Sequence, residues 1–241
     1  MDSELELSVG MAKVGKFAAG ESGDTLELIE RPKGGISFVL VDGQRSGRGA
    51  KRVSSLVARK AISLLSEGVR DGAAARAAHD YLHAERQGKV SAELVIVSLD
   101  LVTKSLVISR NSHCPVLVLD REGTRWLNEP SAPIGIYEWT KPVIAELPLQ
   151  EGMWVVIFTD GILEAGRYSG HVLDVEPLVV QHTVQPTASA ATLADTLLDQ
   201  AMALDQGRPE DDMSVLVLRL AARPQTLLVR RLAVSFPLPY L

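Results

Sequence analysis

The sequence predicts an α+β fold, a four-layer α-β-β-α sandwich of two mostly antiparallel sheets flanked by helices. Three observations support this prediction. Short runs rich in β-branched residues, bounded by Gly or Pro, recur along most of the chain. Few segments have the three- and four-residue period of an amphipathic helix. In the middle of the chain, predicted strands follow one another through short turns, without the intervening helices of a parallel sheet.

The β-branched runs are predicted as strands. They lie at Leu5–Val14, Thr25–Arg31, Ile36–Val41, Leu94–Leu101, Ser105–Arg110, Val116–Leu119, Val143–Leu147, Trp154–Phe158 and Ser214–Leu220. Within Ala92–Trp126, strand and short turn alternate, so we expect an antiparallel meander there.

Three segments are predicted as helices. Apolar residues from Val53 to Leu65 recur at helical spacing, which predicts a helix over Ala50–Glu67. A second helix is expected over Ala73–Gln87, and a third over Thr187–Leu204, which Gly207-Arg208-Pro209 would end. Two helices early and one late would cover the outer faces of two stacked sheets.

Composition indicates a single domain that avoids polyanions. Of 241 residues, 46% are hydrophobic and 23% charged, with a net charge of −5, which disfavours nucleic acid and membrane surfaces as partners. The single cysteine, Cys114, and the absence of a signal peptide or apolar membrane span predict a cytoplasmic protein. No linker or repeat interrupts residues 1–220, which we expect to form the domain, with an extension over 221–241.

Four aspartates mark predicted strand ends: Asp24, Asp42, Asp160 and Asp211. Each alone is typical of an ordinary turn, because Asp-Gly commonly follows a strand. Strand ends can converge on one edge, however, and converging carboxylates repel unless they are protonated or bridged by cations. An oxygen-rich cluster without His or Cys suits Mg²⁺ or Mn²⁺, and the carbonyl of Gly43 could add a ligand.

The order and spacing of these acids fit a known signature. It is carried by GESGD, FVLVDG, SRNSHCPVLVL, FTDGILEA and EDDMSVLVL, which begin at Gly20, Phe38, Ser109, Phe158 and Glu210. With these motifs the chain resembles the metal-dependent protein phosphatase 2C family, in particular its bacterial branch of RsbX, RsbU and SpoIIE, and most of all stand-alone RsbX.

The resemblance implies a two-metal phosphatase site that holds Mn²⁺ or Mg²⁺. In it Asp42 would bridge two divalent cations and the nucleophilic water, and Gly43 would give its carbonyl. Asp24, Asp160 and Asp211 would complete the metal shells directly or through water. Apart from the resemblance, Asp212 could either orient a metal-bound water or cap the turn before the last strand. The family's Gly-His-Gly is replaced by Gln44–Gly49, where Arg45 or Arg48 could contact the phosphate.

Two other residue pairs have the chemistry of a possible site. His113 and Cys114 could form a catalytic pair, but neighbours in a strand point to opposite faces. His79 and His83, four apart on a predicted helix, could share zinc, but no Glu of a His-Glu-x-x-His motif accompanies them. We therefore expect neither pair to be a site.

The resemblance implies a serine/threonine phosphatase that resets stress signalling by acting on phosphorylated STAS-domain proteins of the stressosome. Alternatives are an RsbU- or SpoIIE-like phosphatase of an anti-anti-sigma factor, a phosphoprotein-binding pseudophosphatase, and a metal nuclease, which the acidic composition disfavours. The apolar extension over 221–241 is predicted as an added strand or packed arm, or else as an arm that docks on a partner.

Overall fold

The structure is a computed structural model that describes residues 4–223 and 229–235. It contains two five-stranded sheets in which every pair of neighbouring strands is antiparallel. One sheet has the order β1-β10-β9-β6-β7 and the other β2-β3-β4-β5-β8. Their strands span Leu5–Val14 (β1), Thr25–Glu30 (β2), Ile36–Gly43 (β3), Ala92–Asp100 (β4), Ser105–Asn111 (β5), Val116–Asp120 (β6), Gly123–Leu127 (β7), Val143–Pro148 (β8), Trp154–Phe158 (β9) and Met213–Ala222 (β10).

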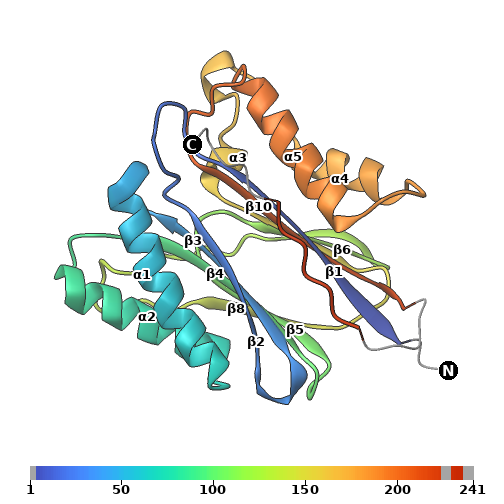
Figure 1. Cartoon of the computed structure of the whole chain (residues 1–241), viewed down its shortest axis with the longest axis horizontal. Coiled ribbons are helices and arrows are strands. Elements are labelled where there is room, and N and C mark those ends of the chain that lie inside the picture. Colours follow the sequence, from blue (N-terminus) through green and yellow to red (C-terminus); the bar gives the residue numbers. More distant parts are fainter. Residues whose placement is uncertain (1–3, 224–228, 236–241) are drawn as a thin grey trace.

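Helices cover the outer face of each sheet, which confirms the predicted four-layer sandwich (Figure 1). The helices α1 and α2 lie over the β2–β8 sheet, and α4 and α5 over the β1–β7 sheet. The helices span Gly47–Ser66 (α1), Asp71–Arg86 (α2), Asp160–Leu163 (α3), Val175–Thr183 (α4) and Ala190–Leu204 (α5), with short 3₁₀ turns at Pro32–Gly34 (η1) and Arg167–Ser169 (η2).

The two-residue period of each strand divides its side chains between two cores. In β3, Phe38 and Leu40 pack between the sheets, whereas Val39 and Val41 pack under α1 and α2. In β9 the same alternation places Val155 and Ile157 in the core between the sheets. These central strands are buried on both faces, which is why their sequences are nearly continuous apolar runs.

The ends of the helices follow recognisable local signals. Ser189 caps α5, since its hydroxyl accepts from the backbone N–H of Thr192 while the Thr192 side chain bonds back to Ser189. After α1, Gly68 adopts a φ of +86°, which a residue without Cβ takes at no steric cost. The three predicted helices are therefore confirmed, with ends shifted by up to three residues from Ala50–Glu67, Ala73–Gln87 and Thr187–Leu204.

The structure differs from the prediction in several elements. Strand β7, GTRWL, was not predicted because it is not a β-branched or apolar run. Helix α3 has only four residues, and α4, VEPLVVQHT, is a β-branched run with a proline in its first turn, so neither was predicted. The predicted meander over Ala92–Trp126 is wrong, since β6 leaves the sheet of β4 and β5 and pairs with β7 and β9. Short apolar strands buried on both faces carry no signal that says which sheet they join.

The extension beyond β10 is only partly described. Residues 229–235 form neither helix nor strand, and Arg230 makes an ion pair with Glu30 of β2. The apolar residues predicted to contribute at 227, 228, 236 and 238 lie outside the described residues. In the part of the chain that the structure describes, no helix has the length and hydropathy needed to cross a bilayer.

Candidate metal centre

Three of the predicted acids surround one pocket at the edge where the two sheets meet the loops. Asp42 lies near the end of β3, Asp160 begins α3 directly after β9, and Asp211 precedes β10. All three line a pocket of about 200 Å³, together with Gly43 and Glu93. Strand ends from both sheets thus bring together carboxylates that are far apart in sequence, as predicted.

Asp24, the fourth acid, lies fully buried beside this pocket. Its Oδ2 accepts hydrogen bonds from the hydroxyls of Thr159 (3.0 Å) and Ser214 (2.6 Å), whereas its Oδ1 has no hydrogen-bond partner. Its backbone carbonyl accepts from the ammonium groups of Lys13 (3.0 Å) and Lys51 (2.7 Å). A buried carboxylate oxygen without a partner is costly, so this atom is suited to a cation or a bound water.

The carboxylates perturb one another strongly. Burial, and then the negative charges of Asp24, Asp160 and other nearby acids, raise the pKa of Asp42 to about 10. Burial, followed by the charge of Asp211, also raises the pKa of Asp160 above its usual range. For Asp24, burial raises the pKa to about 6 although its two hydroxyl partners oppose the rise. Nearby cations such as Lys13 and His113 therefore offset the mutual repulsion of these acids only in part.

The glycines after Asp42 and Asp160 have a packing role. A Cβ on Gly43 would lie 2.2 Å from the carbonyl oxygen of Ala50, and a Cβ on Gly161 would lie 2.2 Å from that of Asp212. Because these glycines have no side chain, the end of β3 packs closely against α1, and the start of α3 packs closely against the residue before β10. These glycines therefore have a packing role, in addition to the carbonyl ligand expected of Gly43.

Asp212 fixes the loop that carries Asp24. Its carboxylate accepts from the backbone N–H groups of Lys16 (2.9 Å) and Gly23 (2.8 Å), and its side chain does not line the acid pocket. The two arginines of the Gln44–Gly49 loop separate: Arg45, with a φ of +70°, lines the acid pocket, whereas Arg48 lines a different pocket along α1. Only Arg45 is placed where it could contact a phosphate in the acid pocket.

A Glu93–His113 pair at the rim of the pocket was not predicted. Glu93 lies directly opposite Asp42 in the β3–β4 register, and its carboxylate bonds to the His113 ring and to the Ser112 hydroxyl. Burial favours a higher pKa for Glu93, but these hydrogen bonds outweigh it and hold the pKa below its usual value. Only the strand register reveals Glu93, because its sequence context, AELVIV, is that of an ordinary strand.

The two alternative pairs are not metal or nucleophile sites of the predicted kind. His79 accepts from the backbone N–H of Gly135 (3.0 Å), and the His83 ring contacts the carbonyl of the same glycine (3.2 Å), so both hold that loop. His113 and Cys114 belong to a bend and lie 3.9 Å apart at Nε2 and Sγ, so the expectation of opposite strand faces was wrong. Burial nevertheless raises the pKa of the Cys114 thiol, which disfavours a nucleophilic thiolate.

The residues fit divalent metal ions. The pocket offers carboxylate oxygens from three chain segments, and the orphaned Oδ1 of Asp24 lies buried beside it. Hard cations with oxygen ligands would relieve the mutual repulsion that raises the pKa of Asp42. Glu93, His113 and Cys114 also have ligand atoms within 4.8 Å of one another, but His113 is already engaged by Glu93.

Comparison with known proteins places this geometry in a family. The family model of stage II sporulation protein E (SpoIIE) matches residues 32–221. None of the curated proteins matches the chain in sequence. Among solved structures, the PP2C phosphatase domain of SpoIIE from Bacillus subtilis, with a fragment of its regulatory domain, has a TM-score of 0.78 at 21% identity, over 92% of this chain and 65% of that one.

Two further structures contain metal ions. The catalytic domain of the serine/threonine protein phosphatase PstP, in complex with two manganese ions, has a TM-score of 0.70 at 14% identity, over 90% of this chain and 100% of that one. RsbX in complex with magnesium has a TM-score of 0.69 at 13% identity, over 91% and 100% of the two chains. With the fold of these PP2C phosphatases and a family match over residues 32–221, the chain belongs to the SpoIIE family.

Proposed function

We propose that the protein is a metal-dependent serine/threonine protein phosphatase whose Asp42, Gly43, Asp160 and Asp211, with Asp24, hold two divalent cations. The observation that carries this proposal is the convergence of Asp42, Asp160 and Asp211 on one pocket where the pKa of Asp42 rises to about 10. Carboxylates that repel one another this strongly cost stability unless protons or cations bind them, and two divalent cations would neutralise the cluster without protonating it. PstP with two manganese ions and RsbX with magnesium share the fold, which supports this choice of metals.

When bound, the two cations would supply a water acidic enough to attack phosphorus and would offset charge on the phosphoryl oxygens. The chain's own residues would position the reactants. Thr159 and Ser214 orient Asp24 through hydrogen bonds to its Oδ2. Arg45 lies in the acid pocket and would orient the phosphate, while the buried Cys114 would take no part in covalent chemistry.

The substrate we propose is a phosphorylated STAS-domain protein of bacterial stress signalling, as in the RsbX-type resetting of the stressosome. The likeness in fold to RsbX supports this choice. The match of residues 32–221 to the SpoIIE family model favours a second candidate, a phosphorylated anti-anti-sigma factor.

The test is Mn²⁺-dependent hydrolysis of a small aryl phosphate and of phosphorylated STAS-domain candidates. Asp42→Asn should lower kcat/KM by at least ~10³-fold, because a residue proposed to hold both cations is lost. Asp195→Asn, a change of the same type at an exposed site on α5, is the control. Hydrolysis that resists chelators, or that survives Asp42→Asn, would exclude the two-metal proposal. Phosphopeptide binding without hydrolysis would instead identify a pseudophosphatase.

A further inference from the structure

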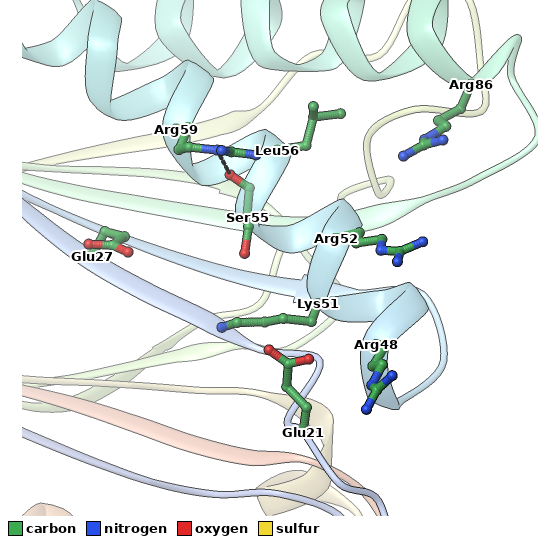
Figure 2. Close-up of a pocket in the computed structure, with 9 residues that line it drawn as sticks. All are labelled: Glu21, Glu27, Arg48, Lys51, Arg52, Ser55, Leu56, Arg59 and Arg86. Carbon is green, nitrogen blue, oxygen red and sulfur yellow. Dashed lines mark hydrogen bonds between the residues drawn. The ribbon is translucent and has the colours of Figure 1, made fainter. Parts of the chain in front are cut away.

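A second, larger pocket lies along α1 (Figure 2). We call it the basic groove; it has a volume of about 610 Å³. Its cationic lining residues are Arg48, Lys51, Arg52, Arg59 and Arg86, of which Arg86 comes from α2 and the others from α1. Two carboxylates, Glu21 and Glu27, lie at its edge toward β2 (Figure 2).

The cations of the basic groove are mostly available to a ligand. Within the described part of the chain, Arg48 and Arg52 make neither an ion pair nor a side-chain hydrogen bond, and both are exposed. The buried Nε of Arg86 has no hydrogen-bond partner. A buried guanidinium nitrogen without an acceptor is unusual, so the protein leaves the charge of Arg86 without a partner at this nitrogen.

The basic groove and the acid pocket lie on two sides of one short loop. Arg45 lines the acid pocket, and Arg48, three residues later, lines the groove. Lys51 joins the two sites directly, because its ammonium group donates to the backbone carbonyl of Asp24 (2.7 Å) and to the Thr25 hydroxyl (2.9 Å). A chain whose phosphorylated residue enters the acid pocket could therefore continue along α1.

The length of the groove suits a peptide segment. The eleven residue-to-residue steps from Arg48 to Arg59 span ~16 Å of helix at ~1.5 Å per step. An extended chain covers that span with about five residues. The groove has five basic side chains against two carboxylates, in a chain whose net charge is −5. Positive charge is thus concentrated where the substrate would lie.

We propose that the basic groove docks an acidic segment next to the phosphorylated residue of the protein substrate. This proposal rests on the phosphatase function proposed above and names the chemistry that would select the substrate. Charge complementarity favours an acidic segment, and Glu21 and Glu27 at the edge favour a protein of mixed charge over a uniformly anionic polymer or lipid surface.

Two phosphoserine peptides that differ only in four flanking residues, Glu in one and Gln in the other, test the proposal. With Mn²⁺, the wild-type protein should show a kcat/KM about tenfold higher for the acidic peptide, mainly through KM, and the preference should shrink as salt is added. Arg52→Gln and Arg86→Gln should each lower this preference about two- to fivefold. Arg121→Gln, an equal charge change at an exposed site between β6 and β7, should keep it.

Fluorescence anisotropy of the same two labelled peptides measures docking separately from hydrolysis. Preferential binding of the acidic peptide that Arg52→Gln weakens would support docking even if no peptide were hydrolysed, an outcome that would contradict only the phosphatase function. Equal binding of both peptides, or a preference that neither arginine variant changes, would overturn the docking proposal. A third outcome would also overturn it. If neither peptide were preferred, but the protein bound phosphatidylserine vesicles or an RNA oligonucleotide and both arginine variants abolished that binding, the groove would be a site for those ligands.

Discussion

Replacing Asp24 by Asn should stabilise the metal-free protein and remove most of its stabilisation by metal. Burial raises the pKa of this carboxyl from 3.8 to about 6. At neutral pH the ionised carboxylate therefore has a higher free energy in the folded protein than in the unfolded chain, where water solvates it. Two pH units correspond to about 3 kcal/mol. In a domain of this size that is a rise in Tm of roughly 6–12 °C. The amide oxygen of Asn can still accept from Thr159 and Ser214.

The stability difference between Asp24→Asn and the wild-type protein should depend on pH in a defined direction. Below about pH 3.8 the carboxyl is protonated in both folded and unfolded states, so wild type and Asp24→Asn should be equally stable. Between pH 3.8 and about 6 the advantage of the variant should grow, because only the folded wild type still binds the proton, and above pH 6 the advantage should be constant. The raised pKa thus lowers wild-type stability as pH rises.

Thermal unfolding at several pH values, with EDTA and with Mn²⁺, tests this reasoning. Wild-type Tm should rise on addition of Mn²⁺, because binding to the folded state alone stabilises it. Asp24→Asn should lose most of that rise. The control Asp195→Asn, at an exposed site, should behave as wild type. If Asp24→Asn were less stable than wild type in EDTA at pH 8, the buried charge of Asp24 would not destabilise the fold. If the variant kept the full response to Mn²⁺, Asp24 would not be a metal ligand.

Three other predictions follow from the same site. Asp212→Ala removes the acceptor of two backbone N–H groups, so it should lower the free energy of unfolding by about 2–4 kcal/mol in urea, with or without Mn²⁺. Gly161→Ala should lower Tm or prevent folding, because the added Cβ would lie 2.2 Å from a carbonyl oxygen. Gly49→Ala is the matched control: it lies inside α1 with open space around it, so it should raise the free energy of unfolding by about 0.5–1 kcal/mol. Since the pKa of Asp42 is about 10 without metal, Mn²⁺ must displace a proton, and calorimetry should show affinity that increases from pH 6 to 8.5; constant affinity would contradict this.

The sequence could indicate the acids because their signal is local. An aspartate directly after a β-branched run, as at Asp42 and Asp160, identifies a strand end, and strand ends on one edge of a sandwich can converge. The two-sheet architecture follows from the same strand runs. The partition of the strands between sheets does not, since the middle strand β6 could have continued the sheet of β5 by any local criterion.

The features that were missed depend on tertiary register. Glu93 approaches the acids only because β3 and β4 pair so that it lies opposite Asp42. The basic groove was missed for a different reason. The cations at Arg48, Lys51, Arg52 and Arg59 recur at helical spacing, which is also typical of an ordinary solvated helix face. The contribution of Arg86 from α2, and the position of the groove beside the acid pocket, appear only in the folded chain.

The hydrogen bonds of the two lysines near Asp24 support a cation-binding role for the acids. Lys13 and Lys51 both donate to the backbone carbonyl of Asp24, while its carboxylate receives only the neutral hydroxyls of Thr159 and Ser214. Hydroxyl donors fix the carboxylate without removing its charge. A purely structural cluster would gain stability from a direct lysine–carboxylate pair, or from the loss of one acid. Because the chain has two ammonium groups within reach and directs both to the carbonyl, the negative charge remains for ions that come from solution.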